Sequence, residues 1–367
     1  MRIVVTGSNG FIGKNLCATL REYDHFEVCE VHRDTSEKDL QTYISNADFL
    51  FHLAGINRPQ DISEFTSGNV DLTTFIIDTL LKFNRNIPIV LSSTIQVEQD
   101  SPYGKSKLKA EEVIQNYSAS TGALHYIYRF PNVFGKWCKP NYNSFIATFC
   151  NNIMKDDEIS VHDPCAPVRL VYIDDLCASL LGVLEGKNSP GFNKVPVEFN
   201  TTVGEVADIV RSFKASRDTL ITEPVGTGLT RALYATYLSY THPDDFSYDV
   251  VSHTDERGVF CEVLKTHDSG QISFFTAHPG VTRGGHYHHT KSEKFLVIRG
   301  EARFSFRHIL TGERHSITTS GDYPRIVDTV PGWSHDILNT GSDDLLVMLW
   351  ANEIFNPEKP DTKAARV

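Results

Sequence analysis

At 367 residues the chain is too long for one typical hydrophobic core, so we expect two domains. Its 40% hydrophobic and 22% charged residues are typical of a globular protein, and the net charge of −11 disfavours nucleic-acid or anionic-membrane partners. Seven cysteines without a C-x-x-C pair, no signal-peptide pattern and no apolar run of spanning length predict a cytoplasmic protein without membrane insertion.

The first part of the chain alternates short apolar runs with helical segments. The predicted strands are residues 3–6, 26–31, 48–53, 87–91 and 124–128, and the predicted helices are 11–21 and 106–121. Such alternation predicts a parallel sheet with helices on both faces, which is the α/β doubly wound Rossmann-type fold.

From about residue 246 the pattern changes to short runs separated by Gly, Pro and Asp. The predicted strands there are 271–275, 294–298, 302–306 and 345–350. This spacing predicts an antiparallel sandwich or barrel. The turn-rich segment 241–245 lies between the two patterns, so we expect domains at 1–243 and 244–367.

A glycine-rich turn follows the first predicted strand and opens the first helix. Gly7 allows a tight turn, Gly10 lets the backbone approach a diphosphate, and Gly13 permits close helix packing, with Phe11 and Ile12 between them. The helix N-terminus offers free N–H groups to the phosphates. The turn therefore predicts a dinucleotide site.

The residues after the second predicted strand bear on the choice of cofactor. A site for NAD favours a carboxylate here, which binds the ribose hydroxyls. The chain has His32-Arg33-Asp34, and Arg33 can pair with a 2′-phosphate. We therefore expect NADPH, while Asp34 leaves NAD open as the alternative.

Tyr103 and Lys107 are spaced i and i+4, which places them on one face of a helix. A neighbouring ammonium group lowers the pKa of a phenol, so Tyr103 is a candidate general acid. Thr94 ends a predicted strand and can donate a hydrogen bond to a substrate oxygen. These three residues predict carbonyl reduction, with hydride added to carbon and a proton to oxygen.

Here the chain resembles the extended short-chain dehydrogenase/reductase family, over about residues 1–175. The marks are the glycine turn, Leu53-Ala54-Gly55, Asn69-Val70, the Tyr103–Lys107 pair, Arg129-x-x-Asn132-Val133-x-Gly135 and Val171-Tyr172-Ile173-Asp174-Asp175. The resemblance implies that Thr94, Tyr103 and Lys107 are catalytic, that Leu53, Ala54, Gly55 and Lys107 bind the cofactor, and that the substrate is a nucleotide-linked sugar. The family's dehydratases have Asp-Glu after the threonine, whereas this chain has Ile95-Gln96, so we expect reduction rather than elimination.

The second domain contains a histidine-rich cluster. His286 and His288, at i and i+2 on a strand, point to one face, Glu293 follows on the next strand, and His335 follows a Pro-Gly turn. Three imidazoles and a carboxylate suit Zn, Fe, Mn or Ni. His289 points to the opposite face, and we leave it out of the ligand set.

This cluster resembles the metal-binding motifs of the cupin superfamily, over about residues 250–355. Gly280-x5-His286-x-His288-x4-Glu293-x6-Gly300 matches the first motif, and Pro331-Gly332-x2-His335-x3-Asn339 matches most of the second. The resemblance implies an all-β cupin barrel. The metal is either catalytic or a structural ion that holds the barrel together.

Over its full length the chain resembles bifunctional enzymes of capsular-polysaccharide and O-antigen biosynthesis. The similarity includes residues 134–143, 234–240, 288–295 and 350–355. It implies that the cupin epimerises C3 of a UDP-2-acetamido-2,6-dideoxy-4-hexulose and that the first domain then reduces C4 with NADPH. The product implied is UDP-2-acetamido-2,6-dideoxy-L-talose, a precursor of UDP-N-acetyl-L-fucosamine, and the family implies zinc and a homodimer.

Two other functions remain open. In the first alternative, the cupin is a non-catalytic sugar-binding or dimerisation module beside a plain NADPH-dependent reductase. In the second alternative, the cupin is a metal-dependent dioxygenase. The general base of the cupin is not identified among its candidates, which are Arg283, Tyr287, Lys294 and Tyr323. Arg169 is a candidate diphosphate contact or a plain surface arginine.

Overall fold

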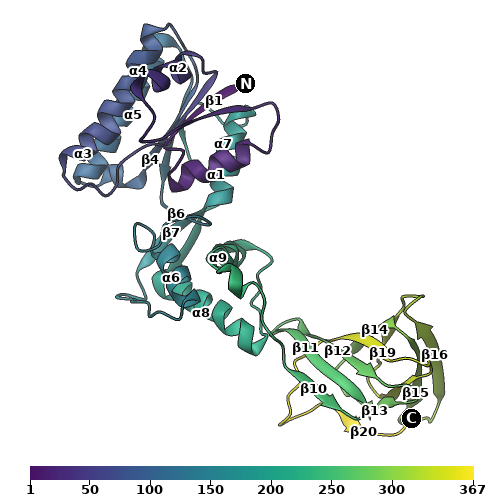
Figure 1. The fold of residues 1–367 in the computed structure, drawn as a ribbon. Coiled ribbons are helices and arrows are strands. Elements are labelled where there is room, and N and C mark those ends of the chain that lie inside the picture. The colour runs from purple at the N-terminus through teal and green to yellow at the C-terminus, as the bar shows by residue number, and fades with distance from the viewer. The chain divides into compact units, whose positions relative to one another are not determined.

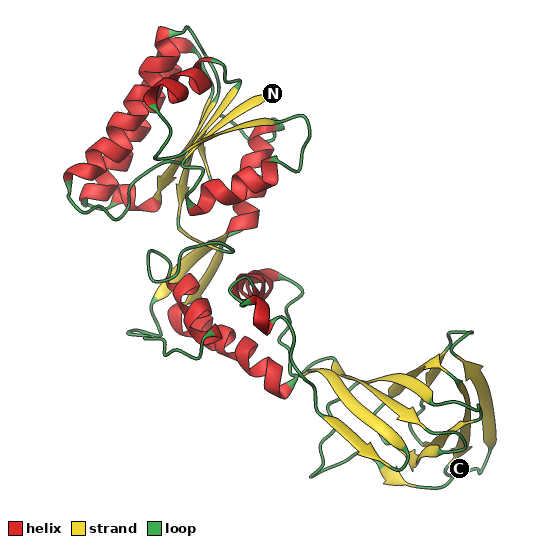
Figure 2. Ribbon diagram, viewed as in Figure 1, coloured by secondary structure: helices red, strands yellow, loops and turns green.

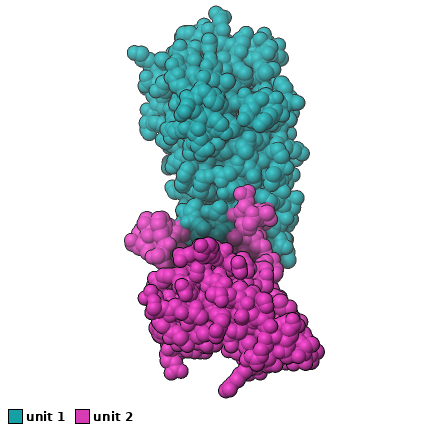
Figure 3. Space-filling view, turned by 90° about the vertical axis from the view of Figure 1, so that its right-hand side faces the viewer, with its two compact units in different colours: residues 1–210, 232–240 teal, residues 211–231, 241–367 magenta.

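The computed structural model describes residues 1–367, which form two compact units (Figure 3). One unit comprises residues 1–210 and 232–240, and the other comprises 211–231 and 241–367. No helix in either unit is both long and apolar enough to cross a lipid bilayer.

The first unit is built on a six-stranded sheet in the order β2-β1-β3-β4-β5-β8, and every neighbouring pair of strands is parallel. The predicted parallel sheet is therefore confirmed. Its strands are β1 (Arg2–Thr6), β2 (Glu27–Val31), β3 (Phe49–His52), β4 (Ile89–Thr94), β5 (His125–Phe130) and β8 (Gly191–Asn193).

Helices cover both faces of this sheet (Figure 1). The helices α2 (Glu37–Ser45), α4 (Leu72–Lys82) and α5 (Pro102–Thr121) lie on one face, and α1 (Phe11–Leu20) and α7 (Ile173–Leu184) lie on the other. Apolar side chains of β1, β3 and β4 pack against α2, α4 and α5 in a buried core. Burial of these residues is the main driving force for this layered arrangement.

One predicted boundary near the catalytic candidates was wrong, and another was confirmed. The helix expected over 106–121 begins at Pro102, because the Ser101 hydroxyl accepts from the Gly104 N–H at 3.0 Å and proline suits the first helical position. The strand that contains the apolar run 87–91 ends at Thr94, as expected, and its last three residues are polar yet buried. Thr94 therefore lies at the end of β4, and Tyr103 lies in the first turn of α5.

The first unit also contains a smaller three-stranded sheet, and the chain forms several further helical elements. The sheet consists of β6 (Asn132–Phe134), β7 (Pro167–Tyr172) and β9 (Phe199–Thr202), and β7 pairs parallel to β6 and antiparallel to β9. The remaining helical elements are α3 (Ser63–Phe65), η1 (Thr66–Asp71), η2 (Ile95–Glu98), α6 (Phe145–Met154), α8 (Val203–Thr219), α9 (Gly228–Leu238) and η3 (Pro243–Asp245).

The second unit contains two antiparallel sheets (Figure 2). One sheet has the order β10-β11-β12-β19-β14-β17 and the other β16-β15-β18-β13-β20, so the predicted all-β region is confirmed. The strands are β10 (Ser252–Asp255), β11 (Gly258–Thr266), β12 (Gly270–Ala277), β13 (Thr282–Tyr287), β14 (Glu293–Arg299), β15 (Glu301–His308), β16 (Arg314–Ser320), β17 (Ile326–Asp328), β18 (Trp333–Asn339), β19 (Leu345–Ala351) and β20 (Lys363–Ala364).

The two sheets share one apolar core. Phe295 of β14 and Phe304 of β15 belong to different sheets, and their ring centroids are 5.8 Å apart. Buried and exposed side chains alternate along β15, as expected for a strand with one face on the core. Three of the metal-ligand candidates lie on strands of these sheets, and His288 directly follows one of them.

Candidate active site and metal centre

The glycine turn has the geometry that close backbone packing demands. Gly7 has φ +71°, and a Cβ at Gly13 would lie 2.1 Å from the carbonyl oxygen of Gly7. A Cβ at Gly7 would lie 2.7 Å from the amide nitrogen of Ala54. Helix α1 begins directly after Gly10 without a side-chain cap, so its first N–H groups are free to bind an anion.

A cavity of about 670 Å³ lies at the carboxyl ends of β1, β3 and β4. This is the edge at which doubly wound sheets bind ligands. The structure brings ten of the predicted site residues together in its lining: Gly7, Gly10, Phe11, Ile12, Gly13, Leu53, Gly55, Thr94, Tyr103 and Lys107.

Two predicted cofactor residues are not in that lining. Ala54 packs with its backbone against Gly7 instead. Arg33 lies in the turn after β2 with an exposed side chain, so the structure does not bring it to the cavity wall.

The three catalytic candidates differ in their surroundings. The Thr94 hydroxyl accepts a hydrogen bond from the Gln96 N–H at 3.2 Å, which leaves its proton free for a ligand. Tyr103 is half-buried, and its ring centroid is 5.7 Å from that of Phe65. Lys107 is fully inside, at 4% exposure.

We expected the pKa of Tyr103 to be lowered, and this expectation was wrong. Burial raises the pKa of Tyr103. Burial also lowers the pKa of Lys107 to about 8, because the ammonium group loses its hydration. The phenol therefore stays protonated near neutrality, which is the state that a proton donor requires.

A network that sequence reasoning missed lies behind Lys107. Glu111 is one helical turn further along α5 and is buried, and it accepts two hydrogen bonds from Arg129, at 3.0 and 2.7 Å. The Ser93 hydroxyl also donates to this carboxylate. The i, i+4 spacing of Lys107 and Glu111 was the available signal, and the negative charge counteracts part of the burial effect on the Lys107 pKa.

A second hollow, of about 470 Å³, contains Arg169 of β7 in its lining. Arg169 Nε lies 3.3 Å from a carboxylate oxygen of Glu198, and both side chains are partly exposed. Asn132 lines both this hollow and the larger cavity.

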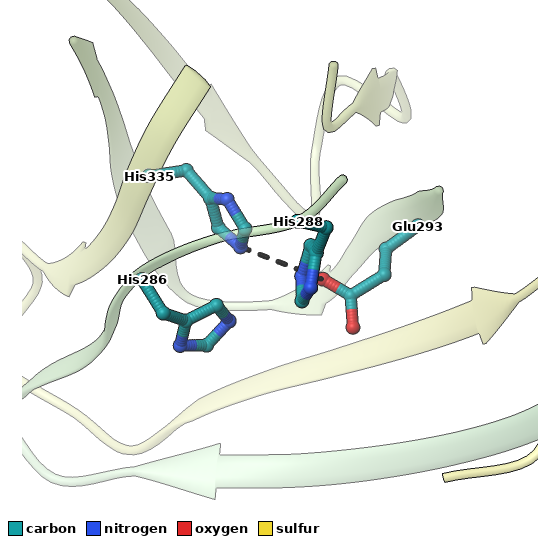
Figure 4. A group of neighbouring side chains, drawn as sticks. All are labelled: His286, His288, Glu293 and His335. Atoms are coloured by element: carbon teal, nitrogen blue, oxygen red, sulfur yellow. Dashed lines mark hydrogen bonds and ion pairs between the residues drawn. The ribbon is translucent and has the colours of Figure 1, made fainter. Parts of the chain in front are cut away.

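The four predicted metal ligands lie together in the second unit (Figure 4). His286 lies on β13, His288 directly after it, Glu293 at the start of β14 and His335 on β18. One potential ligand atom from each lies within 4.8 Å of all the others. The exposed His289 is outside the cluster, as expected.

The donor set of this cluster fits a cation. One carboxylate oxygen of Glu293 lies 3.2 Å from His288 Nε2 and 3.4 Å from His335 Nε2. The imidazole nitrogens and the carboxylate oxygen grouped here are the donor types that bind zinc and related transition-metal ions. Burial and, to a smaller extent, nearby His335 lower the pKa of His286 to about 4, so this ring is neutral near pH 7 and can bind metal.

Lys291 is a charged neighbour of the cluster that sequence reasoning missed. Its ammonium group lies 2.9 Å from the other carboxylate oxygen of Glu293, and both side chains are nearly buried. Burial alone would raise the pKa of Glu293, but His288, His335 and Lys291 outweigh it and hold this pKa well below its usual range. One carboxylate oxygen of Glu293 therefore faces His288 and His335, and the other pairs with Lys291.

The candidate bases of the second unit differ in exposure. Lys294 pairs with Asp328 at 2.6 Å on the surface, and Tyr323 is 80% exposed, so both are surface residues. Arg283 has two buried guanidinium nitrogens without a hydrogen-bond partner, and it lies over the ring of Phe275.

Both units are similar to known protein families. Residues 3–195 match the NAD dependent epimerase/dehydratase family, and residues 253–363 match the polysaccharide biosynthesis C-terminal domain. A UDP-2-acetamido-2,6-beta-L-arabino-hexul-4-ose reductase from Pseudomonas aeruginosa is 53% identical over 100% of this chain and 99% of its own length.

The chain is also similar to solved structures, over its full length or over the first unit. The capsular polysaccharide assembling protein CapF from Staphylococcus aureus has a TM-score of 0.94 and 44% identity, with 100% of both chains covered. A UDP-glucuronic acid 4-epimerase from Bacillus cereus, at 19% identity and a TM-score of 0.56, covers 65% of this chain and shares the fold alone. The resemblance expected from the sequence is confirmed, and the chain belongs to the NAD dependent epimerase/dehydratase family, in a full-length form shared with CapF.

Proposed function

We propose that this protein is a bifunctional UDP-sugar enzyme whose first unit reduces a 4-keto group and whose second unit epimerises C3. The observation that carries the reductase is the cavity that joins the glycine turn to Thr94, Tyr103 and Lys107. The full-length relative named as a UDP-hexul-4-ose reductase supports this substrate class.

In the proposed reduction, the glycine turn and Lys107 would hold NADPH, which would supply the hydride for C4 of the sugar. Tyr103 donates its phenolic proton to the C4 oxygen, so the ketone becomes an alcohol. The Thr94 hydroxyl donates a hydrogen bond that holds this oxygen. Lys107, one helical turn from Tyr103, stabilises the phenolate that remains and binds the cofactor ribose.

The cofactor proposal includes a preference for NADPH over NADH. Arg33 follows β2, the position at which dinucleotide folds contact the adenosine ribose. Its side chain is exposed, so it is available to pair with a 2′-phosphate. Asp34 beside it is the residue that would favour NADH.

For the second unit we propose a cupin barrel with a catalytic metal. His286, His288, Glu293 and His335 would hold Zn²⁺, or Fe, Mn or Ni, and the ion would stabilise negative charge that develops on a ligand oxygen. The proton on C3 is acidic because it lies beside the C4 ketone. Reduction of C4 removes this acidity, so epimerisation precedes reduction.

We also propose a substrate, a product and an oligomeric state for this protein. The substrate is a UDP-2-acetamido-2,6-dideoxy-4-hexulose, and the product is UDP-2-acetamido-2,6-dideoxy-L-talose, a precursor of UDP-N-acetyl-L-fucosamine. The functional domains are residues 1–243 and 244–367, and the protein acts as a homodimer. The relative CapF, described as a capsular polysaccharide assembling protein, supports a role in capsule or O-antigen synthesis.

The test gives the 4-keto UDP-sugar to the wild type, Tyr103→Phe and His288→Ala in deuterium oxide. NADPH absorbance follows reduction, and mass spectrometry follows deuterium at C3. We expect Tyr103→Phe to exchange C3 without oxidising NADPH, because it lacks the proton donor. We expect His288→Ala to lose metal and C3 exchange but to bind NADPH.

Two results would contradict the proposal. If the wild type consumes no NADPH with this sugar, the reductase assignment is wrong. If His288→Ala exchanges C3 as fast as the wild type, the second unit is a binding or dimerisation module and the protein is a plain reductase. Oxygen consumption by an iron-loaded preparation would indicate a dioxygenase instead.

A further inference from the structure

The C-terminal segment returns to the strand that carries the first metal-ligand candidates. After β19 ends, the chain runs to β20, which pairs antiparallel with β13 in the register His286↔Ala364 and Tyr287↔Lys363. The Ala365 N–H also donates to the carbonyl of Gly285 at 2.9 Å. The strand β20 therefore forms an edge of the sheet that carries His286 and His335.

Asp361, just before β20, binds the loop between β13 and β14. Its carboxylate accepts from the backbone N–H groups of His289 at 3.0 Å, Thr290 at 2.7 Å and Lys291 at 2.9 Å. The Thr290 hydroxyl donates to it as well, at 3.0 Å. A charged acceptor with four donors is a strong anchor for a loop that has no regular structure of its own.

The backbone carbonyl of Asp361 contacts one of the metal-ligand candidates directly, because it lies within hydrogen-bonding distance of His288 Nδ1. A carbonyl only accepts, so Nδ1 carries a proton, and Nε2 is left as the nitrogen that can bind a metal. This Nε2 faces Glu293 in the cluster. By contrast, His335 Nδ1 is buried without a hydrogen-bond partner.

The same anchor affects a second candidate ligand. Lys291 donates its backbone N–H to Asp361, and its ammonium group binds the outer oxygen of Glu293 at 2.9 Å. The Asp361 carboxylate thus helps to place both the ring of His288 and the carboxylate of Glu293.

We propose that Asp361 is a positioning residue of the metal centre, which fixes the loop after β13 so that His288 and Glu293 face the ion in the binding orientation. The inference rests on the proposed metal site and adds the C-terminal segment to it. Hydrogen-bonded neighbours of metal ligands typically change metal affinity 10–100-fold when they are removed.

The experiment measures Zn²⁺ affinity of the full chain by competition with a chromophoric chelator, for the wild type, Asp361→Ala, Asp361→Asn and His288→Ala. Glu358→Ala is the matched control, since it removes an exposed acid three residues earlier. The bonds of Asp361 to His289 and Thr290 are exposed, so water can replace the carboxylate and the variants should fold. Thermal unfolding of the metal-free proteins checks this.

We expect Asp361→Ala to bind Zn²⁺ about 10–100-fold more weakly than the wild type and Asp361→Asn to show a smaller loss. We expect the Zn²⁺ affinity of Glu358→Ala to equal that of the wild type. We expect the melting midpoints of the metal-free variants to stay at the wild-type value. The visible absorption of the Co²⁺-loaded Asp361 variants should also change, because it reports ligand geometry.

The outcomes separate this inference from the proposed function. If His288→Ala loses Zn²⁺ while Asp361→Ala binds it as tightly as the wild type, Asp361 has no positioning role but the metal site stands. If Asp361→Ala lowers only the melting midpoint, its role is structural. If His288→Ala binds Zn²⁺ like the wild type, the metal site and this inference both fail.

Discussion

In the first unit the catalytic candidates lie along one edge of a parallel sheet, whereas in the second unit the candidate ligands come from three antiparallel strands and the loop between two of them. The first site is an open cavity of about 670 Å³ with free donors, ready for a large ligand. The second site is a compact group whose ligand atoms lie within 4.8 Å of one another.

This difference shows how two kinds of chemistry are prepared. Hydride transfer needs room for a dinucleotide and a sugar, so its residues stand apart at strand ends and on α5. Metal binding needs donors at short distances, and three of the four candidate ligands are buried, with Glu293 close to both His288 and His335. The predictions below perturb one region while the other serves as a reference.

The largest expected effect is that of Gly13→Ala. Its Cβ would collide with the backbone oxygen of Gly7, so the turn must open. We expect loss of NADPH binding by more than about 100-fold and a decrease of about 1–3 kcal/mol in the free energy of unfolding. NADPH fluorescence titration and urea unfolding measure these.

The control is Gly226→Ala, whose Cβ meets nothing within 4 Å. Zn²⁺ binding should stay at wild-type values in both variants. Wild-type NADPH affinity in Gly13→Ala would contradict the assignment of the glycine turn to the cofactor.

Next in size is Glu293→Gln, which acts on the other region. It removes the only negative charge of the cluster and leaves Lys291 nearly buried without its partner. We expect Zn²⁺ affinity to fall by more than about 100-fold, beyond the usual loss from an outer neighbour of a ligand. Glu301→Gln on the exposed face of β15 should have no effect, and NADPH affinity should be unchanged in both.

A smaller effect is expected from Arg33→Ser, which tests the cofactor preference. Loss of a charge-assisted bond to the 2′-phosphate should raise the KM for NADPH about 10-fold and leave that for NADH unchanged. Lys38→Ser removes an exposed charge nearby and should not change either value. An unaltered ratio of the two KM values in Arg33→Ser would make Arg33 a plain surface charge.

The smallest effect is the pH dependence of reduction. Burial lowers the pKa of Lys107 to about 8, so this side chain is charged below that pH and neutral above it. If the reaction uses the charged form, kcat/KM should decrease as pH rises and be about fourfold lower at pH 8.5 than at pH 6.5. Lys105→Met, which removes an exposed lysine, should keep this profile; a flat profile would contradict the role of Lys107.

Much of both sites could be predicted because local patterns encode them. The glycine turn, the Tyr103–Lys107 spacing and the His286-x-His288 pair each lie within a few residues, and the periods of helix and strand fix which face they share. The burial of the polar residues that end β4 was not predicted. In the fold they are buried and bonded, as Ser93 is to Glu111.

Long-range partners could not be predicted in the same way. Asp361 binds a loop 70 to 72 residues earlier in the chain, and no periodic pattern links the two segments. The surroundings of Tyr103 could not be predicted either, because the burial of its side chain depends on how Phe65 packs against α5. Pairings between distant segments arise from the sheet register, which a single sequence does not specify.

The most direct test of the divided labour is deuterium exchange at C3 of the 4-keto UDP-sugar without NADPH, in metal-stripped and zinc-reloaded preparations of the folded wild type. The account predicts negligible exchange without metal and restored exchange after reloading, while NADPH binding is the same in both. Equal exchange in the two preparations would contradict a catalytic role for the histidine cluster.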